Sequence, residues 1–369
     1  MPSAKIKTRA ALFHGPGMPL TIEPIDLDPP GPHQVLIRMR AVGICGTDLH
    51  QIRGEWTRPT PMVLGHEGAG TVEAVGADVA SVIPGDEIVL SWAASCGHCG
   101  DCDRGRPAAC QQLHAALAAG TLVDGTTGMS QENRTVYRGT ATGALSELLV
   151  VDEKVVIPTG GRLALEQAAL LGCAAMTGAG AVLFGADRGG GDSLLVIGLG
   201  GVGQFCAQGA RIAGYSTIIG VDPAPERRAL AQRVGATHVA SPEQLEFLVR
   251  DVAANGVDVA FDAVGAPATT ATALRSVRNG GRAVVVGLAA AGNRLDLDPA
   301  EFVRREKQLT GSMYGSYDPR RGIRTLIGHV EAGRLDLESI LGGSYPLDAV
   351  EEAISDSLSG MPGRAIVTL

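Results

Sequence analysis

The segment that most constrains the fold is a glycine-rich turn at residues 198–203, with the sequence GLGGVG. It follows the wholly apolar run 194–197 (LLVI) and leads into a helical stretch at 202–213. A short strand made only of apolar residues is typical of a parallel sheet that is covered on both faces. A strand, a glycine turn and a helix in this order therefore predict a doubly wound α/β domain.

The same alternation continues along the chain. Further strands are predicted at 217–222, 257–264 and 283–287, with a helix at 226–234. The tail departs from the pattern, with helices expected at 321–332 and 347–359 and a last strand at 364–369.

The first third of the chain has a different pattern of predicted secondary structure. Short β-runs at 35–39, 70–75 and 86–91 are separated by turn sequences at 29–32 and 84–86. This density of short strands predicts a mostly antiparallel, barrel-like domain. At roughly 100–200 residues per domain, the 369 residues suggest two domains. We expect a catalytic domain at residues 1–175 and 313–369, and a cofactor domain at 176–312.

Composition excludes several classes of protein. Hydrophobic residues make up 45% and charged residues 19%, which is not the composition of a disordered chain. The formal net charge of −8 argues against a nucleic-acid partner. By this reading no apolar run reaches the roughly 20 residues of a membrane span, and no apolar core follows the basic N-terminal residues. We therefore expect a cytoplasmic protein without a membrane partner.

The glycine turn predicts a dinucleotide site, because each glycine has a physical role. Gly198 permits the tight turn, Gly200 allows the backbone to approach a pyrophosphate, and Gly203 lets the helix pack on the strand. Gly201 and Val202 open the helix, whose free N–H groups favour an anion. The alternative is a glycine turn in a packed α/β unit with no ligand.

An acidic residue follows at the distance that such a site needs. Asp222 lies 19 residues after Gly203 and ends the next predicted strand. A carboxylate there accepts hydrogen bonds from the ribose hydroxyls and repels a 2′-phosphate, which predicts NAD over NADP. Arg227, five residues later, could soften this preference.

Four of the seven cysteines, Cys96, Cys99, Cys102 and Cys110, form a C-x2-C-x2-C-x7-C run. Four thiolates on a tight loop can enclose a tetrahedral Zn²⁺ without an open position, as in a structural site. His98 lies inside the run, and we expect it to be exposed or to contact one of the metal ligands. An iron–sulfur cluster is the first alternative, but the ferredoxin run ends C-x3-C-P. Disulfides are the second, and they need an oxidising compartment.

Three further segments carry chemical side chains: 43–50 (GICGTDLH), 65–67 (GHE) and 172–173 (GC). Their cysteines and histidine are 21 and 107 residues apart, so spacing alone does not unite them.

Taken together, these motifs resemble the zinc-dependent alcohol dehydrogenases of the medium-chain dehydrogenase/reductase superfamily. The resemblance covers nearly the whole chain and is greatest to the liver-type and glutathione-dependent formaldehyde dehydrogenase branch. It implies a GroES-like catalytic domain and a Rossmann cofactor domain.

The resemblance also implies roles for individual residues. Cys45, His66 and Cys173 would bind a catalytic zinc, giving two zinc ions per chain with the four-cysteine site. Asp48 would accept the other ring N–H of His66, and Glu67 would approach the metal during ligand exchange. Thr47 and His50 match a proton relay, while Val264 and Arg364 match positions near the cofactor.

The implied reaction is reversible hydride transfer between an alcohol and NAD. Zinc acts as a Lewis acid on the substrate oxygen, and Thr47 and His50 carry the proton away. Trp56 and Trp92 favour an apolar or aromatic primary alcohol, although both could be core or interface residues. Arg138 could meet an acidic substrate group or be a solvated loop residue, and Cys206 is expected to be buried.

Several alternatives remain open. The first is a thiol-dependent S-(hydroxymethyl) formaldehyde dehydrogenase, followed by a polyol dehydrogenase, a zinc-free quinone reductase and a non-enzymatic NAD-binding protein. The segment 111–139 resembles a loop of the dimeric relatives, so a homodimer is expected ahead of a homotetramer.

Overall fold

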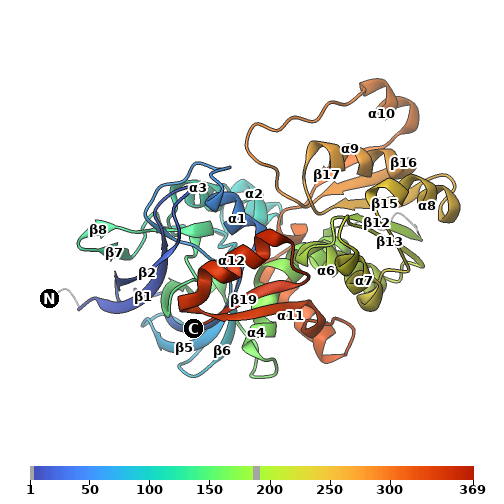
Figure 1. The fold of residues 1–369 in the computed structure, drawn as a ribbon. Coiled ribbons are helices and arrows are strands. Elements are labelled where there is room, and N and C mark those ends of the chain that lie inside the picture. Colours follow the sequence, from blue (N-terminus) through green and yellow to red (C-terminus); the bar gives the residue numbers. More distant parts are fainter. Residues whose placement is uncertain (1–3, 186–191) are drawn as a thin grey trace. The chain divides into compact units, whose positions relative to one another are not determined.

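A computed structural model describes residues 4–185 and 192–369 of the chain (Figure 1). The chain divides into two compact units. The first comprises Met1–Cys173, Asp318–Ile327 and Leu341–Leu369, and the second comprises Ala174–Tyr317 and Gly328–Ile340. The expected domain division at residues 175 and 313 stays a prediction.

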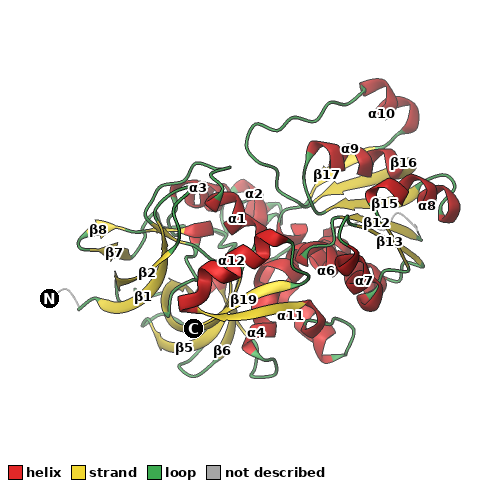
Figure 2. Ribbon diagram, viewed as in Figure 1, coloured by secondary structure: helices red, strands yellow, loops and turns green. Residues whose placement is uncertain are grey.

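The first unit is built mainly from two sheets of largely antiparallel strands (Figure 2). One sheet has the order β8-β7-β2-β1-β4-β9, and the other has the order β11-β6-β5-β3-β19-β18, with β10 also paired to β3. The strands are β1 (Ile6–Phe13), β2 (Thr21–Leu27), β3 (Gln34–Gly43), β4 (Met62–Val63), β5 (Glu67–Val75), β6 (Glu87–Leu90), β7 (Met129–Gln131), β8 (Arg134–Thr135), β9 (Tyr137–Arg138), β10 (Leu148–Asp152), β11 (Val156–Pro158), β18 (Leu341–Pro346) and β19 (Arg364–Thr368).

Short helices connect these strands. They are α1 (Gly46–Ile52), α2 (Gly100–Asp103), α3 (Gln111–Ala119), α4 (Leu165–Leu170) and α12 (Val350–Ser359), while α11 (Pro319–Glu331) begins in the first unit and ends in the second.

Strand β3 organises the first unit because it is paired on both sides. It runs antiparallel to β5 along its length, and its other edge pairs with β10 and then with β19. The register sets Gly43, the last residue of β3, opposite both Glu67 and Ile366. Residues that follow β3, precede β5 and begin β19 are therefore gathered at one end of the sheet.

A large apolar core lies in the first unit. Side chains from β1, β3, β4 and β10 are fully or almost fully buried in it, among them Leu12, Ile37, Val63 and Leu149. Burial of this apolar area is the main stabilising contribution to the unit.

The second unit contains a six-stranded sheet with the order β14-β13-β12-β15-β16-β17 in the described residues, and every pair in it is parallel. The strands are β12 (Ser193–Ile197), β13 (Thr217–Val221), β14 (His238–Ala240), β15 (Val257–Asp262), β16 (Val277–Val285) and β17 (Gln308–Gly311). The helices are α5 (Met176–Gly180), α6 (Gly201–Ala213), α7 (Pro225–Val234), α8 (Leu245–Val252), α9 (Pro267–Ser276) and α10 (Pro299–Arg305).

Both faces of this sheet are covered, as the apolar run in β12 predicts. Leu194 and Val196 pack with residues of α6 and α7, whereas Leu195 and Ile197 pack with residues of α8 and α9. Successive side chains of a strand point to opposite faces, so a strand between two helical layers must be apolar at every position. The doubly wound α/β expectation is confirmed.

The predicted elements match the structure in kind, but several of the predicted strands differ in extent, and the runs predicted at 35–39 and 70–75 belong to longer strands, β3 and β5. The predicted strand 257–264 ends at Asp262, and the strand predicted at 283–287 begins earlier, at Val277. Strand β16 begins with the sequence VRNGG, which is mostly polar and partly exposed. This start lacks the apolar pattern by which a strand is predicted. The sequence reading also missed the N-terminal strands β1 and β2.

The expectation that no apolar stretch reaches membrane-spanning length is wrong for one segment. The structure has a continuous helical stretch, Leu165–Gly185, of 21 residues that is long and apolar enough to cross a membrane. However, 78% of its most apolar part is buried inside the protein, which is the behaviour of a core helix. The segment is rich in alanine and glycine, which pack closely in a protein core. Because these small residues are only weakly apolar, the sequence pattern did not mark the segment as one long apolar run.

Candidate metal centres and dinucleotide site

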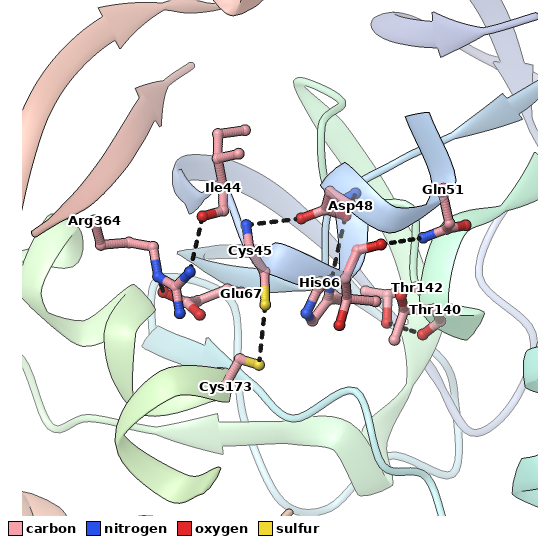
Figure 3. Close-up of polar contacts among 12 residues, drawn as sticks. Ile44, Cys45, Asp48, Gln51, His66, Glu67, Thr140, Thr142, Cys173 and Arg364 are labelled. Carbon is pink, nitrogen blue, oxygen red and sulfur yellow. Dashed lines mark hydrogen bonds and ion pairs between the residues drawn. The ribbon is translucent and has the colours of Figure 1, made fainter. Parts of the chain in front are cut away.

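Three side chains from distant parts of the sequence meet in the first unit (Figure 3). Cys45 precedes α1, His66 precedes β5, and Cys173 follows α4. All three are buried, and their ligand atoms lie within 4.8 Å of one another. The cross-strand pair Gly43 and Glu67 brings the first two together. Helix α4 packs on β3, β5 and β6 and delivers the third.

The close approach at Cys173 depends on a glycine. A Cβ at Gly172 would lie 2.4 Å from the Leu90 carbonyl oxygen, so only glycine allows this segment to approach β6. The sequence reading included Gly172 in a motif but gave it no role.

The donor set fits a zinc ion. The sulfur atoms of Cys45 and Cys173 are 3.9 Å apart. Two thiolates at Zn–S distances of about 2.3 Å and a tetrahedral angle would be separated by about 3.8 Å. Two sulfurs and one imidazole leave a fourth position of the tetrahedron for another ligand, as in a catalytic site. The residues predicted as catalytic zinc ligands are thus placed so that they could hold this ion.

Asp48 is fixed beside His66 by the backbone. Its Oδ2 accepts a hydrogen bond from the Cys45 N–H at 2.9 Å, and its Oδ1 accepts one from the Gly65 N–H at 3.2 Å. The same Oδ1 lies 3.4 Å from Nδ1 of His66. A carboxylate facing Nδ1 favours the tautomer that leaves Nε2 to bind a metal.

Glu67 is fully buried and faces an arginine. Its Oε1 lies 3.1 Å from Nε of Arg364, and Nη1 of Arg364 donates a hydrogen bond to the Ile44 carbonyl at 3.0 Å. The carboxylate also needs space beside Gly43, because a Cβ there would lie 2.5 Å from Oε1. Arg364 therefore neutralises a buried acid next to the candidate metal ligands, and its predicted contact with a cofactor stays a prediction.

The three side chains of this candidate metal site perturb one another electrostatically. A hydrogen bond from Cys173 holds the pKa of the Cys45 thiol well below its usual range. Donation of that hydrogen bond, together with burial, raises the pKa of Cys173. Burial lowers the pKa of His66, but Asp48 and Cys45 outweigh it and raise that pKa well above its ordinary value. Such mutual perturbation is typical of functional sites.

The two predicted relay residues both lie on α1. Thr47 and His50 are half-buried. His50 is placed at the end of the helix, where Nδ1 contacts the carboxylate of Glu55 and the ring stacks on Trp56 with centroids 4.8 Å apart. The sequence reading missed Glu55, whose only signal was an acidic residue in the turn after the relay histidine.

The four-cysteine run forms a second cluster. The ligand atoms of Cys96, Cys99, Cys102 and Cys110 all lie within 4.8 Å of one another. Three of the sulfur–sulfur distances are 3.6, 3.9 and 3.9 Å, near the tetrahedral value and far longer than a disulfide bond. All seven cysteines of the chain are free.

The cluster is assembled by local structure. Cys99 precedes α2, Cys110 precedes α3, and the Cys96 N–H points to the Cys110 sulfur at 3.4 Å. Backbone N–H groups of Cys102 and Gln111 lower the pKa of Cys99 to about 6. His98 is exposed, as expected, and hydrogen bonds to the Cys96 carbonyl through Nδ1 at 3.0 Å.

The glycine turn lies between β12 and α6 in the second unit. Gly198 has a φ of +85°, and a Cβ at Gly203 would lie 1.8 Å from the Gly198 carbonyl oxygen, so both glycines are required by the fold itself. A Cβ at Gly200 would meet nothing within 4 Å. No described residue lies where it would require glycine at position 200, which fits its predicted role of approaching a ligand. Gly201 and Val202 begin α6, as predicted.

Asp222 follows β13 and is buried next to this turn. Its Oδ2 accepts the Leu199 N–H at 2.8 Å, its Oδ1 accepts the Ala224 N–H at 2.9 Å, and Nη1 of Arg227 lies 3.8 Å from Oδ2. Each carboxylate oxygen retains further acceptor capacity, so a ribose hydroxyl can still bind. Val264, the other predicted cofactor residue, is partly exposed after β15, and its side chain lies beside Gly198.

Three residues of uncertain role are now placed. Arg138 is not a solvated loop residue, since it is 1% exposed and donates to the carbonyls of Thr127 and Thr142. Cys206 is buried in α6, as expected, and burial raises its pKa to about 12. Trp92 is buried as well.

Comparisons with known proteins agree along the whole chain. The family described as "Alcohol dehydrogenase GroES-like domain" matches residues 31–161, and the family described as "Zinc-binding dehydrogenase" matches residues 201–331. An S-(hydroxymethyl)glutathione dehydrogenase of Escherichia coli O1:K1 / APEC is 33% identical over 368 residues, which cover 98% of this chain and 100% of that protein.

Two solved structures are similar over the full length. An alcohol dehydrogenase zinc-binding domain protein from Burkholderia ambifaria has a TM-score of 0.93 and 33% identity, covering 99% of this chain and 100% of that one. Benzyl alcohol dehydrogenase from Acinetobacter calcoaceticus has a TM-score of 0.93 and 26% identity, covering 99% of both chains.

Proposed function

Because this chain belongs to the zinc-dependent alcohol dehydrogenases of the medium-chain dehydrogenase/reductase superfamily, we propose that it oxidises an apolar or aromatic primary alcohol to the aldehyde and transfers the hydride to NAD. The family consists of oxidoreductases, and this chain is one of them. The single observation that carries the proposal is the buried cluster of Cys45, His66 and Cys173.

The proposal assigns these three side chains to a catalytic zinc and the four-cysteine cluster to a structural zinc. A zinc ion held by the first cluster would supply a Lewis acid at the substrate oxygen, while bound NAD would supply the hydride acceptor. Asp48 orients His66 for this task through its contact at Nδ1. Glu67, held by Arg364, is the neighbouring carboxylate that could approach the metal when ligands exchange.

The proton leaves through hydroxyl and imidazole groups. The Thr47 hydroxyl would take the substrate hydroxyl proton and release its own proton towards His50, which would pass a proton to solvent. His50 suits this role because its side chain is 23% exposed and can exchange protons with water. Removal of the substrate proton by these residues is general acid–base catalysis, which typically contributes 10²–10⁴-fold to a rate.

NAD is proposed over NADP because a carboxylate at the end of β13 would repel a 2′-phosphate. The buried carboxylate of Asp222 supports this preference. Arg227 lies 3.8 Å from the same carboxylate and would partly neutralise it. The ratio of kcat/KM with NAD to kcat/KM with NADP measures the preference directly.

The likeness to benzyl alcohol dehydrogenase, together with Trp56 near the relay, supports an aromatic or apolar substrate. A second candidate is a thiol adduct of formaldehyde, because the Escherichia coli relative is an S-(hydroxymethyl)glutathione dehydrogenase. In that case NADH formation from formaldehyde would require glutathione. A cytoplasmic homodimer remains our proposal for location and assembly.

One experiment tests the proposal. Purified protein is assayed for NADH and NADPH formation with primary, secondary, aromatic and polyol alcohols, and with formaldehyde in the presence and absence of glutathione. Metal content is measured on the same sample. We expect two zinc ions per chain and the highest kcat/KM with aromatic or apolar primary alcohols and NAD. Full activity after complete removal of zinc would refute the proposal and favour a zinc-free reductase.

A further inference from the structure

The turn after α1 returns the chain onto the relay histidine. Gly54 adopts a φ of +71°, and the Glu55 N–H donates a hydrogen bond to the His50 carbonyl at 3.0 Å. A Cβ at Gly54 would lie 2.8 Å from the Pro16 side chain, so the turn is also packed from outside. This geometry directs the side chain of Glu55 back towards Nδ1 of the His50 imidazole.

Both carboxylate oxygens of Glu55 are engaged. Oε2 contacts Nδ1 of His50, and Oε1 lies 3.8 Å from Nη1 of Arg53. Trp56 makes a second contact with His50. Its ring stacks on the imidazole with an interplanar angle of 27°. The carboxylate thus fixes one ring nitrogen, and the indole fixes the plane of the ring.

We propose that Glu55 is a positioning residue for the proton relay, which orients His50 with a protonated Nδ1 and leaves Nε2 as the nitrogen that accepts the substrate proton. The inference rests on the proposed function, since it assigns Glu55 a role in the same relay. A carboxylate paired with one ring nitrogen sets the tautomer and strengthens the other nitrogen as a base.

The charges balance through the step. The proposed step begins with a proton on Nδ1 of His50 and none on Nε2. When Nε2 takes a proton, the imidazolium charge is opposed by the carboxylate at Nδ1, and the proton then leaves Nε2 for solvent. Glu55 itself neither gains nor loses a proton.

The first test reads the tautomer of His50. Zinc-loaded protein labelled with ¹⁵N at its histidine rings is examined by NMR, and the His50 signals are identified by their absence in His50→Gln. We expect a protonated Nδ1 in the wild type and a mixture of tautomers in Glu55→Ala. An unchanged tautomer in Glu55→Ala would overturn the inference.

The second test separates positioning from general stability. We expect Glu55→Gln to lower kcat for alcohol oxidation about tenfold with little change in KM, because the carboxylate acts through the relay. Its effect should vanish in a His50→Gln background. Imidazole buffer should restore part of the lost rate, which it cannot do for a merely unfolded protein. The matched control is Glu153→Gln, which removes the carboxylate 3.6 Å from Nδ1 of His33 and should leave kcat unchanged.

The outcomes distinguish this inference from the proposed function. If His50→Gln itself leaves kcat unchanged, the relay in the proposed function fails. If His50→Gln lowers kcat and Glu55→Gln does not, or if the two substitutions reduce kcat independently, the role of Glu55 alone is refuted.

Discussion

Oδ1 of Asp48 lies 3.4 Å from Nδ1 of His66, and both side chains are 1% exposed. Two backbone N–H groups, those of Cys45 and Gly65, hold the carboxylate in place. The residue that orients the histidine is thus anchored to the backbone beside two proposed zinc ligands, Cys45 and His66.

Replacing Asp48 should weaken metal binding. We expect Asp48→Ala to reduce the affinity of the three-ligand site for zinc by about 10–100-fold, because the outer partner of a ligating histidine sets its orientation. Competition with a chromophoric chelator measures this affinity. The four-cysteine site serves as an internal control, since its zinc should be retained in the variant. Equal loss from both sites would contradict the expectation.

The two zinc sites should separate by mutation. Cys173→Ser should leave one zinc per chain and a stable protein without dehydrogenase activity. Cys110→Ser opens the closed four-sulfur site, so zinc loss there should lower Tm, because structural zinc contributes directly to folding. Metal analysis and thermal unfolding of the two variants check both statements. A Cys173→Ser protein that keeps two zinc ions and full activity would be inconsistent with the proposed ligands.

Two glycines of the turn should respond differently to alanine. A Cβ at Gly203 meets the Gly198 carbonyl oxygen at 1.8 Å, whereas a Cβ at Gly200 meets nothing. We expect Gly203→Ala to destabilise the protein by about 3 kcal/mol or more. Gly200→Ala should keep its stability within about 0.5 kcal/mol but bind NADH more weakly. Denaturant unfolding and NADH fluorescence titration provide the two readouts, and unchanged NADH affinity in Gly200→Ala would count against a pyrophosphate at this turn.

The buried guanidinium of Arg138 should be a structural tie. Nε donates to the Thr127 carbonyl at 2.5 Å and Nη1 to the Thr142 carbonyl at 2.8 Å, and burial lowers the pKa of Arg138 to about 9. Arg138→Ala should cost about 3 kcal/mol, because it leaves one buried and one partly buried carbonyl without these donors. The control is Arg134→Ala, whose side chain is 78% exposed and should change the free energy of unfolding by less than about 0.5 kcal/mol.

Asp258 predicts an acid-dependent loss of stability. Burial raises its pKa, but hydrogen bonds from Ser193 and Arg278 outweigh it and lower the pKa from 3.8 to about 2. The contribution is complete above the unfolded pKa and is lost as the pH falls from about 4 to about 2. It should reach about 2 kcal/mol, because each pKa unit corresponds to about 1.4 kcal/mol.

The measurement for Asp258 is a difference. Acid also protonates other groups, so the free energy of unfolding is compared between the wild type and Asp258→Asn at each pH. The gap between them should be widest at neutral pH and should close towards pH 2. A gap that does not depend on pH would show that the ion pair does not carry this contribution.

Local motifs carried most of what could be predicted. The glycine turn, the apolar strand before it and the four-cysteine run each lie within a short segment. Residues that are close in the sequence of such a segment are also close in space. Arg138 shows the limit of such reasoning, because its burial depends on carbonyls supplied by two loops that the sequence does not mark. Likewise, Glu55 reaches His50 only because Gly54 turns the chain back.

By itself, the sequence determined which residue types are present and which segments form strands, helices and tight turns, because these depend on side-chain pattern and backbone preference over a few residues. Only the tertiary structure decided that Cys45, His66 and Cys173 meet, with their ligand atoms within 4.8 Å of one another. The physical reason is sheet register: pairing of Gly43 with Glu67 and packing of α4 on β3, β5 and β6 bring together residues separated by 21 and 107 positions, and no local spacing encodes that.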